Sequence, residues 1–288
     1  MAKRIRDTQL RFDLPLEMTV HGNPFLKWAG GKSQLLPQFE NFFPSKFKRY
    51  FEPFLGGAAV FFRLAPNNAI LSDLNPDLID TYLVVRDHVE ELIQALICYK
   101  SKSNESNYYA IRDGIDPKEL PLVERAARFI YLNKNCFNGL YRVNRRGKFN
   151  VPFGYYKSPS IFKAENLRNS SIALHNALLK VSDFEESVSI ARKGDFVYFD
   201  PPYAPLTPTS SFTSYTKDNF DSQAHERLAR VVKQLDKRGV LFMLSNSPKP
   251  FIIELYRSYH IEIVSANRAI NSNGKKRGVV EELLVMNY

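Results

Sequence analysis

The sequence predicts an α/β fold in which a mostly parallel sheet is interrupted by an inserted region of helices and one hairpin. Two observations lead to this prediction. Strand-like apolar runs occur early and late in the chain and alternate with helical patterns, as they do where helices connect parallel strands. Between them, residues 75–162 show helical spacing and then a Gly- and Arg-rich stretch. We therefore expect residues 1–74 and 163–288 to form one domain, with residues 75–162 inserted into it.

The early elements lead from a short strand through a glycine turn into helices. Residues 51–65 (FEPFLGGAAVFFRLA) pass from an apolar run through Gly56-Gly57 into a helical stretch. Residues 69–73 (AILSD) predict a brief buried strand that ends on a carboxylate. From Pro76 to about Leu132, apolar residues recur at three- and four-residue spacing, which is typical of helices.

The pattern changes after this helical stretch. Between residues 133 and 160 the helical period is lost, and Arg146-Gly147 indicates the turn of a hairpin. Strand-like runs then return. They cover residues 195–200, 240–245, 261–264 and 282–286, and helical patterns at 221–237 and 250–259 separate the first three.

Composition narrows the class of protein. The 288 residues include 40 Lys and Arg against 30 Asp and Glu, and the net charge of +10 favours a polyanionic partner. A hydrophobic fraction of 44% excludes a disordered chain. No run approaches the ~20 apolar residues of a membrane span, and the basic N-terminal residues lack an apolar secretory segment. Two cysteines cannot form a disulfide framework or a four-ligand zinc site. We expect a cytoplasmic protein that uses neither membrane nor metal.

The most informative motif is Asp200-Pro201-Pro202-Tyr203, directly after the strand-like run DFVYF. In an open α/β sheet, ligands bind beyond the carboxyl ends of the strands. An exocyclic amino group on a nucleobase is a poor nucleophile because its lone pair is delocalised into the ring. The Asp200 carboxylate and the Pro201 carbonyl can accept its hydrogens and localise that lone pair, while Tyr203 stacks on the base. A simple loop after a strand is the alternative explanation.

Four motifs occur in order along the chain. They are FLKWAGGK at 25–32, FEPFLGG at 51–57, NGLYRVN at 138–144 and DPPY at 200–203. In these motifs the chain resembles the Dam family of DNA adenine-N6 methyltransferases, in the α-type arrangement, from about Pro24 onward. The resemblance implies a Rossmann-like methyltransferase sheet dependent on S-adenosylmethionine (SAM), with an inserted target-recognition domain. It also implies methyl transfer to adenine N6 in double-stranded DNA. The catalytic residues are then Asp200, Pro201, Pro202 and Tyr203.

The segment around Gly56 has a nucleotide-binding pattern of its own. Glycine lets the backbone approach a ligand closely, and Asp73 follows at a spacing where an acidic residue meets ribose hydroxyls. The resemblance implies that the ligand is SAM, released as S-adenosylhomocysteine. It implies contacts from Trp28, Lys32, Asp73 and Asp200, and a pocket lined by Glu52, Phe54 and Gly56. An ATP-binding phosphate loop at Gly31-Lys32-Ser33 is excluded, because it needs glycine at position 26, where the chain has leucine.

Residues 138–157 favour DNA contact over a merely solvated hairpin. They contain Arg142, Arg145, Arg146, Lys148 and Lys157, no acidic residue, and interleaved aromatic residues. The Arg142 guanidinium can bind guanine O6 and N7 together, and Leu140 and Pro152 can contact a thymine methyl. The resemblance implies recognition of GATC by Lys27, Leu140, Arg142 and Pro152. Asn138 and Asn144 complete the expected DNA-binding set. The basic N-terminal residues and Lys275-Lys276-Arg277 are expected to add phosphate contacts.

Alternative functions share parts of this pattern. An amino methyltransferase that acts on RNA or on a protein amide uses similar acceptors, although Asn commonly replaces the motif's Asp in such proteins. A cytosine-N4 methyltransferase typically has Ser there. A SAM-binding, DNA-binding regulator without turnover would not need the intact motif. The five histidines form no metal-ligand or nucleophile pattern. We expect a monomer or weak dimer, acting alone or within a restriction-modification pair.

Overall fold

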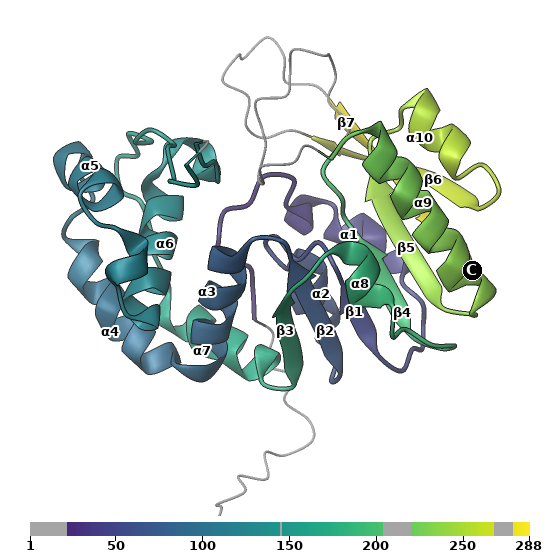
Figure 1. Cartoon of the computed structure of the whole chain (residues 1–288), viewed down its shortest axis with the longest axis horizontal. Helices are drawn as coiled ribbons and strands as arrows, with labels where there is room; N and C mark the ends of the chain where they lie inside the picture. Colours follow the sequence, from purple (N-terminus) through teal and green to yellow (C-terminus); the bar gives the residue numbers. More distant parts are fainter. Residues whose placement is uncertain (1–21, 145, 204–219, 268–278) are drawn as a thin grey trace, which may run out of the picture.

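The computed structural model describes residues 22–144, 146–203, 220–267 and 279–288, and within them a seven-stranded mixed sheet carries helices on both faces (Figure 1). The strands in chain order are β1 (Tyr50–Glu52), β2 (Ala69–Asp73), β3 (Ala177–Val181), β4 (Phe196–Phe199), β5 (Leu241–Asn246), β6 (His260–Asn267) and β7 (Val279–Met286). Their order across the sheet is β3-β2-β1-β4-β5-β7-β6. The first five strands run parallel, and β7 lies antiparallel between β5 and β6.

The first described helix precedes β1, and the others lie between successive strands from β1 to β6, with one long helical region between β2 and β3. They are α1 (Leu36–Phe39), α2 (Ala59–Leu64), α3 (Pro76–Asp87), α4 (Val89–Lys100), α5 (Glu105–Asp113), α6 (Leu122–Asn135), α7 (Ala164–Leu174), α8 (Phe184–Val188), α9 (Ser222–Lys237) and α10 (Pro250–Leu255). Short 3-10 turns include η1 (Lys32–Gln34) and η4 (Phe137–Gly139). None of these helices is long and apolar enough to cross a bilayer. The predicted α/β class is confirmed.

Side-chain alternation divides the hydrophobic core into two layers, one on each face of the sheet. Successive residues of a strand point to opposite faces. The first core lies under α1, α2 and α3, and the second lies under α8, α9 and α10. From β4 and β7, the first core receives Phe196, Tyr198, Leu284 and Met286, and the second receives Val197, Phe199, Leu283 and Val285. This alternation decides which residues meet beyond the strand ends.

Helices α4, α5 and α6 gather to one side of the sheet and share the first core with it (Figure 1). Helix α3 joins the two regions, because it packs against β2 and β3 as well as against α6. Residues 136–157, which we call the recognition segment, fold back onto these helices. The Tyr108 hydroxyl donates to the Val151 carbonyl at 2.8 Å, and Cys136 and Phe153 form an antiparallel bridge.

The hairpin expected at Arg146-Gly147 is confirmed, although it is short. Val143 and Phe149 form its single antiparallel bridge, and the Asn144 amide donates to the Lys148 carbonyl at 2.8 Å. Gly147 has a φ of +75°, a left-handed conformation that glycine adopts without strain.

The sequence patterns missed one strand and extended one helix too far. Strand β3 was not predicted, because five residues (ALLKV) follow α7 directly and carry apolar side chains on both faces. Leu179 is buried, whereas Leu178 and Val181 are exposed at the edge of the sheet. Helix α10 ends at Leu255, before the expected residue 259. The division into domains at residues 75 and 162 stays a prediction.

Candidate active site

Four polar side chains meet on the first-core face of the sheet, at the end where the parallel strands finish. Asp200 follows β4 in the same alternation as Tyr198, and Ser245 lies near the end of β5. Glu52 ends β1. Glu282 enters the same place from β7, two residues before Leu284. Because β7 is antiparallel to β5, its early residues lie beside the last residues of β5.

Lys32 lies in the middle of this group and is only 3% exposed. Its ammonium is 2.5 Å from Asp200 Oδ1 and 3.5 Å from Glu282 Oε1, and it donates to the Gly30 carbonyl at 2.8 Å. Burial by itself lowers the pKa of Lys32, but the charges and hydrogen bonds of the two carboxylates outweigh burial and raise the pKa above its ordinary value. Lys32 is therefore a charged ammonium that links the N-terminal turn η1 to the end of β4.

Asp200 is held by a second donor and still reaches the surface. The Ser245 hydroxyl donates to Asp200 Oδ1 at 3.1 Å, and the Tyr198 hydroxyl is 2.9 Å from Ser245 Oγ. The Asp200 side chain is 20% exposed. Both Lys32 and Ser245 bind Oδ1, so neither bond uses the lone pairs of Oδ2.

The rest of the motif turns outward from Asp200. Pro201 is buried and Pro202 is exposed. The half-buried Tyr203 donates its hydroxyl to Glu282 Oε1, and its ring centroid is 5.1 Å from the Lys32 ammonium. Burial and the neighbouring carboxylates raise the pKa of Tyr203, so its hydroxyl is a donor rather than an anion.

The glycine turn after β1 forms the second half of the site. Gly56 has a φ of +46°, and a Cβ added there would lie 2.7 Å from Trp28 Cδ1, so only glycine fits beneath the indole ring. Asp73 Oδ2 accepts from the Gly56 amide at 3.1 Å, and its Oδ1 accepts from the Asn75 amide at 3.0 Å. Burial nevertheless raises the pKa of Asp73.

Trp28 joins this turn to the recognition segment. Its ring stacks on Tyr141 with centroids 5.7 Å apart and planes inclined by 23°. The Tyr141 hydroxyl donates to Asp77 Oδ2 at 3.2 Å, at the start of α3. Phe54 packs against the second core instead, where its ring centroid is 5.4 Å from that of Phe184.

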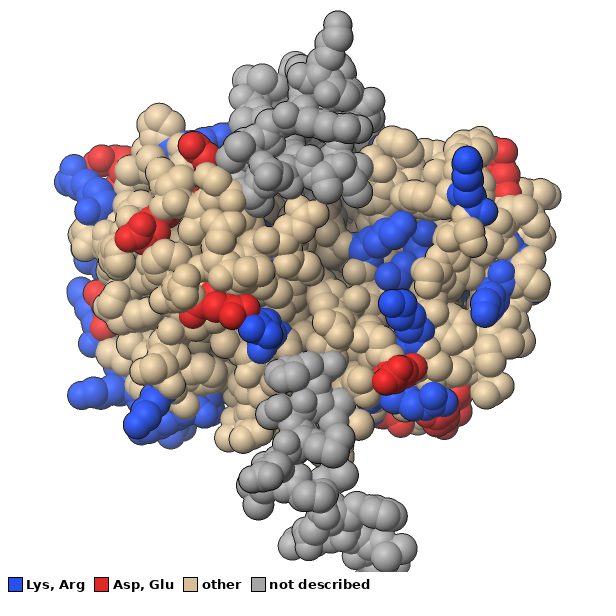
Figure 2. Space-filling model, turned by 180° about the vertical axis from the view of Figure 1, so that it is seen from behind, with Lys and Arg blue, Asp and Glu red and all other residues tan. Residues whose placement is uncertain are grey.

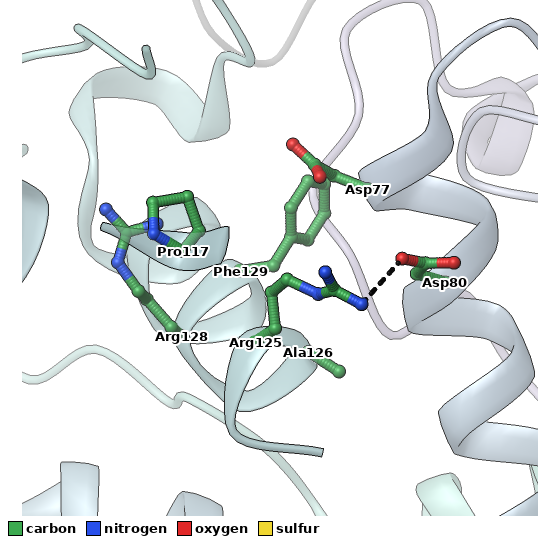
Figure 3. A pocket seen from close by; sticks show the side chains of 7 residues that line it. All are labelled: Asp77, Asp80, Pro117, Arg125, Ala126, Arg128 and Phe129. Atoms are coloured by element: carbon green, nitrogen blue, oxygen red, sulfur yellow. Dashed lines mark ion pairs between the residues drawn. The ribbon is translucent and has the colours of Figure 1, made fainter. Parts of the chain in front are cut away.

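A small cavity lies between α3 and α6 and shares only Asp77 with the groups described above (Figure 3). It is lined by Asp77, Asp80, Pro117, Arg125, Ala126, Arg128 and Phe129, and Arg125 pairs with Asp80 at 3.2 Å. Its volume of about 20 Å³ suits a single water molecule and excludes a cofactor. Within the described residues, no group of three or more His, Cys, Asp or Glu side chains could hold a metal ion.

The structure brings most of the predicted DNA-binding residues together. Lys27 packs into the recognition segment, with its ammonium 3.9 Å from the Tyr156 ring centroid. Asn138 is exposed with a φ of +55°, Leu140 is half-buried and Pro152 is exposed. Asn144 lies in the hairpin, where its side-chain oxygen accepts from the amides of Arg146 and Lys148.

Arg142 is oriented by a residue that sequence reasoning missed. Its Nε donates to Asn150 Oδ1 at 2.8 Å, and its Nη2 donates to the Asn150 carbonyl at 3.2 Å. A guanidinium has five N–H groups, so both Nη1 hydrogens and one Nη2 hydrogen remain for a ligand. The guanidinium can therefore still present a two-pronged donor.

Other site residues were also absent from the sequence prediction. Glu282, Ser245 and Tyr198 belong to no motif, and Tyr141 lies in the NGLYRVN motif without an assigned role. Only Glu282 offered a signal, because a carboxylate within the apolar run ELLVM must be paired if it is buried. Arg145, the residues before Gly22 and Lys275-Lys276-Arg277 lie outside the described residues.

Glu52 is a buried carboxyl group that favours its neutral form. It is 2% exposed, and it accepts from the Tyr50 hydroxyl at 2.8 Å. Burial raises the pKa of Glu52 to about 8, with the nearby Asp200 charge adding to the effect. A carboxyl group with a raised folded-state pKa contributes stability that is complete below its ordinary pKa and is lost as the pH rises through about 8.

We predict that Glu52→Gln removes this pH dependence, because the amide keeps an oxygen acceptor and cannot ionise. Relative to wild type, the variant should gain about 3 kcal/mol in free energy of unfolding between pH 5 and pH 8. Urea denaturation of both proteins across this range measures the difference. A difference that is the same at pH 5 and pH 8 would contradict the neutral state of Glu52.

Comparison with known proteins identifies the family. Residues 28–270 match the model of the D12 class N6 adenine-specific DNA methyltransferases. The chain is 45% identical to the type II methyltransferase M1.LlaDCHI of Lactococcus lactis subsp. cremoris, over 92% of this chain and 95% of that protein. It is 45% identical to the type II methyltransferase M.MjaIII of Methanocaldococcus jannaschii, over 92% and 99% of the two chains. It is also 36% identical to the DNA adenine methylase of Escherichia coli (strain K12), over 91% and 94%. The carboxylate, proline and tyrosine beyond β4 thus lie in a chain that belongs to the D12 class of N6 adenine-specific DNA methyltransferases.

Proposed function

We propose that this enzyme methylates adenine N6 within GATC in double-stranded DNA, by flipping the adenine out of the helix and transferring the methyl group directly from SAM. The arrangement of Asp200 carries this proposal. Its carboxylate is fixed through Oδ1 by Lys32 and Ser245, reaches the surface, and precedes the Pro201 carbonyl and the Tyr203 ring. These are the groups that an amino nitrogen needs in order to become a nucleophile.

The residues of the motif divide the chemistry between them. We expect Asp200 and the Pro201 carbonyl to accept the two amino hydrogens of adenine, so that the nitrogen lone pair points away from the base. As the methyl group is transferred, positive charge develops on this nitrogen, and the Asp200 carboxylate stabilises it. Because Oδ1 is already fixed, the carboxylate does not rotate. The free-energy barrier to methyl transfer therefore includes less entropy cost for aligning the reacting groups.

The glycine turn suits an adenosine-type ligand such as SAM. When bound, SAM supplies a methyl group on a positively charged sulfonium. Gly56 has a positive φ and no Cβ, so the indole ring of Trp28 lies directly against its backbone. We infer that Asp73 accepts ribose hydroxyls, and that Trp28, Lys32, Glu52, Phe54 and Gly56 line the site. Asp200 and Glu282 share the single ammonium of Lys32, and their negative charge favours a cationic ligand.

Base flipping follows from geometry. Adenine N6 cannot approach Asp200 while the base is stacked in a duplex, so the base must leave the stack at a cost of a few kcal/mol. Tyr203 lies next to Asp200 and is half-buried, so its ring can replace part of the lost stacking. We therefore assign Tyr203 to hold the flipped adenine.

The recognition segment supports DNA reading beside this site. We infer that Arg142 binds a guanine edge and that Leu140 and Pro152 contact a thymine methyl. Lys27 is close to Lys134, and burial together with the Lys27 charge lowers the pKa of Lys134 to about 8. The Lys27 charge beside Lys134 favours an anionic partner such as a phosphate.

The distribution of charge also supports binding through this segment. On the face seen in Figure 2, Lys and Arg lie in separate groups with Asp and Glu among them, so this face presents no continuous basic surface. The recognition segment, in contrast, exposes Arg146, Lys148 and Lys157 with no acidic residue between them. We propose that residues 75–162 serve as the target-recognition domain and that a single chain holds the whole site.

We predict that Asp200→Ala reduces methylation of a GATC duplex by about a thousandfold or more, because the amino hydrogens lose their charged acceptor. Transfer of labelled methyl groups to GATC and scrambled duplexes measures the effect. Circular dichroism and SAM titration of the variant serve as controls for folding and cofactor binding. Near-wild-type turnover by the variant would contradict the assignment. A folded wild type that binds SAM and methylates neither duplex would instead identify a regulator.

We predict that Arg142→Ala relaxes discrimination at one base pair of GATC by about 1–3 kcal/mol, because one base edge is no longer read. The matched control is Arg146→Ala in the same hairpin. It should weaken binding to all duplexes equally. It should also reduce the slope of log affinity against log salt concentration by about one, the value for one lost phosphate contact. Rates on four duplexes with single substitutions test both variants. Unchanged discrimination in Arg142→Ala would contradict its role.

A further inference from the structure

Glu282 is a buried carboxylate directly before the apolar residues 283–286 of β7. It is 3% exposed, and Leu283, Leu284 and Val285 follow it into the two cores. Glu281, the preceding residue, faces the opposite way and is exposed. A carboxylate in this environment is destabilising unless charges and hydrogen bonds compensate for the lost water. Its contacts therefore indicate why it is there.

Among the described residues, Glu282 Oε1 contacts two side chains, and both lie beside Asp200. It accepts the hydroxyl hydrogen of Tyr203, and it lies 3.5 Å from the Lys32 ammonium. Lys32 in turn binds Asp200 at 2.5 Å. One ammonium is therefore shared by two carboxylates, and the tyrosine of the motif is fixed by the second of them.

Strand β7 makes Glu282 a rigid anchor. Its backbone pairs with β6, where Val264 lies opposite Glu282, and the next residue, Leu283, lies opposite Asn246 of β5. Tyr203, in contrast, belongs to the turn that leaves β4. A tyrosine side chain rotates about two bonds, and its hydroxyl oxygen lies on the axis of the second. A hydrogen bond at that oxygen therefore fixes the position of the ring by opposing rotation about the Cα–Cβ bond.

We propose that Glu282 is a positioning residue for methyl transfer, which holds the Tyr203 ring at the position that receives the flipped adenine and shares Lys32 with Asp200. This inference rests on the proposed function of Tyr203 and Asp200. Without Glu282, the ring is free to swing about the Cα–Cβ bond, and Lys32 pairs with Asp200 alone. Glu282 itself touches neither the base nor the methyl group in this assignment.

The first test is a kinetic comparison of Glu282→Ala, Glu282→Gln and the exposed control Glu281→Gln. We expect Glu282→Ala to lower kcat by about 10–100-fold, because the base is held less precisely, with little change in KM for DNA. Glu282→Gln keeps an oxygen that accepts the Tyr203 hydroxyl, so it should recover most of this loss. Glu281→Gln should match wild type. Equal kcat in all four proteins would overturn the inference.

A double-variant cycle separates positioning from a general loss of structure. Tyr203→Phe removes only the hydroxyl, so it should slow the wild type but add less than a twofold effect in Glu282→Ala. Costs that multiply in the double variant would show that Glu282 acts independently of Tyr203. Thermal unfolding of each variant shows whether a loss of rate follows a loss of fold.

The last readout needs no methyl transfer. A duplex with fluorescent 2-aminopurine at the target adenine reports stacking of the flipped base in the absence of SAM. We expect Glu282→Ala to change this fluorescence as Tyr203→Ala does, and Glu282→Gln to resemble wild type. Wild-type fluorescence in Glu282→Ala would overturn the inference. A wild type that fails to methylate adenine would contradict the proposed function, and the fluorescence would still test the positioning of Tyr203.

Discussion

The buried ion pair between the Lys32 ammonium and the Asp200 carboxylate is the contact on which the rest of the site depends. A lysine that is 3% exposed remains charged only beside a carboxylate, and Asp200 supplies one at 2.5 Å. The pair fixes the N-terminal turn against the end of β4, across 168 residues of sequence. It also fixes one oxygen of Asp200, so the orientation of the carboxylate is set before a substrate arrives.

A second set of contacts connects the glycine turn after β1 to the recognition segment. Trp28 lies over Gly56 and stacks on Tyr141, which precedes Arg142 in the recognition segment. The Tyr141 hydroxyl reaches Asp77, four residues beyond Asp73. The glycine turn, Asp77 at the start of α3 and Tyr141 of the recognition segment thus belong to one packed group. We infer that the two binding sites are built on a shared aromatic support rather than on separate surfaces.

The sequence predicted those parts of the structure that follow from local pattern. The apolar runs predicted the positions of β2, β4, β5 and β7. The motif after β4 predicted that Asp200 lies at the end of a parallel strand. Strand β3 escaped prediction because its edge position leaves Leu178 exposed, so five residues show no clear alternation. The hydrogen-bond partners of the site residues were not predicted either. Contacts such as those of Ser245 with Asp200 and of Asn150 with Arg142 depend on which chain segments pack together. Glu282 was predictable only in part. A carboxylate next to apolar residues indicates that it has a buried partner, but the sequence does not show which residue that partner is.

The identity of the methylated atom tests the account most directly. Incubation of the enzyme with SAM carrying a deuterated methyl group and a duplex containing one GATC site, followed by mass spectrometry of the nucleosides, measures it. The arrangement of Asp200, Pro201 and Tyr203 predicts that the label appears on N6 of the GATC adenine and on no other base. Label on cytosine, or no label on DNA from a folded enzyme with bound SAM, would contradict it.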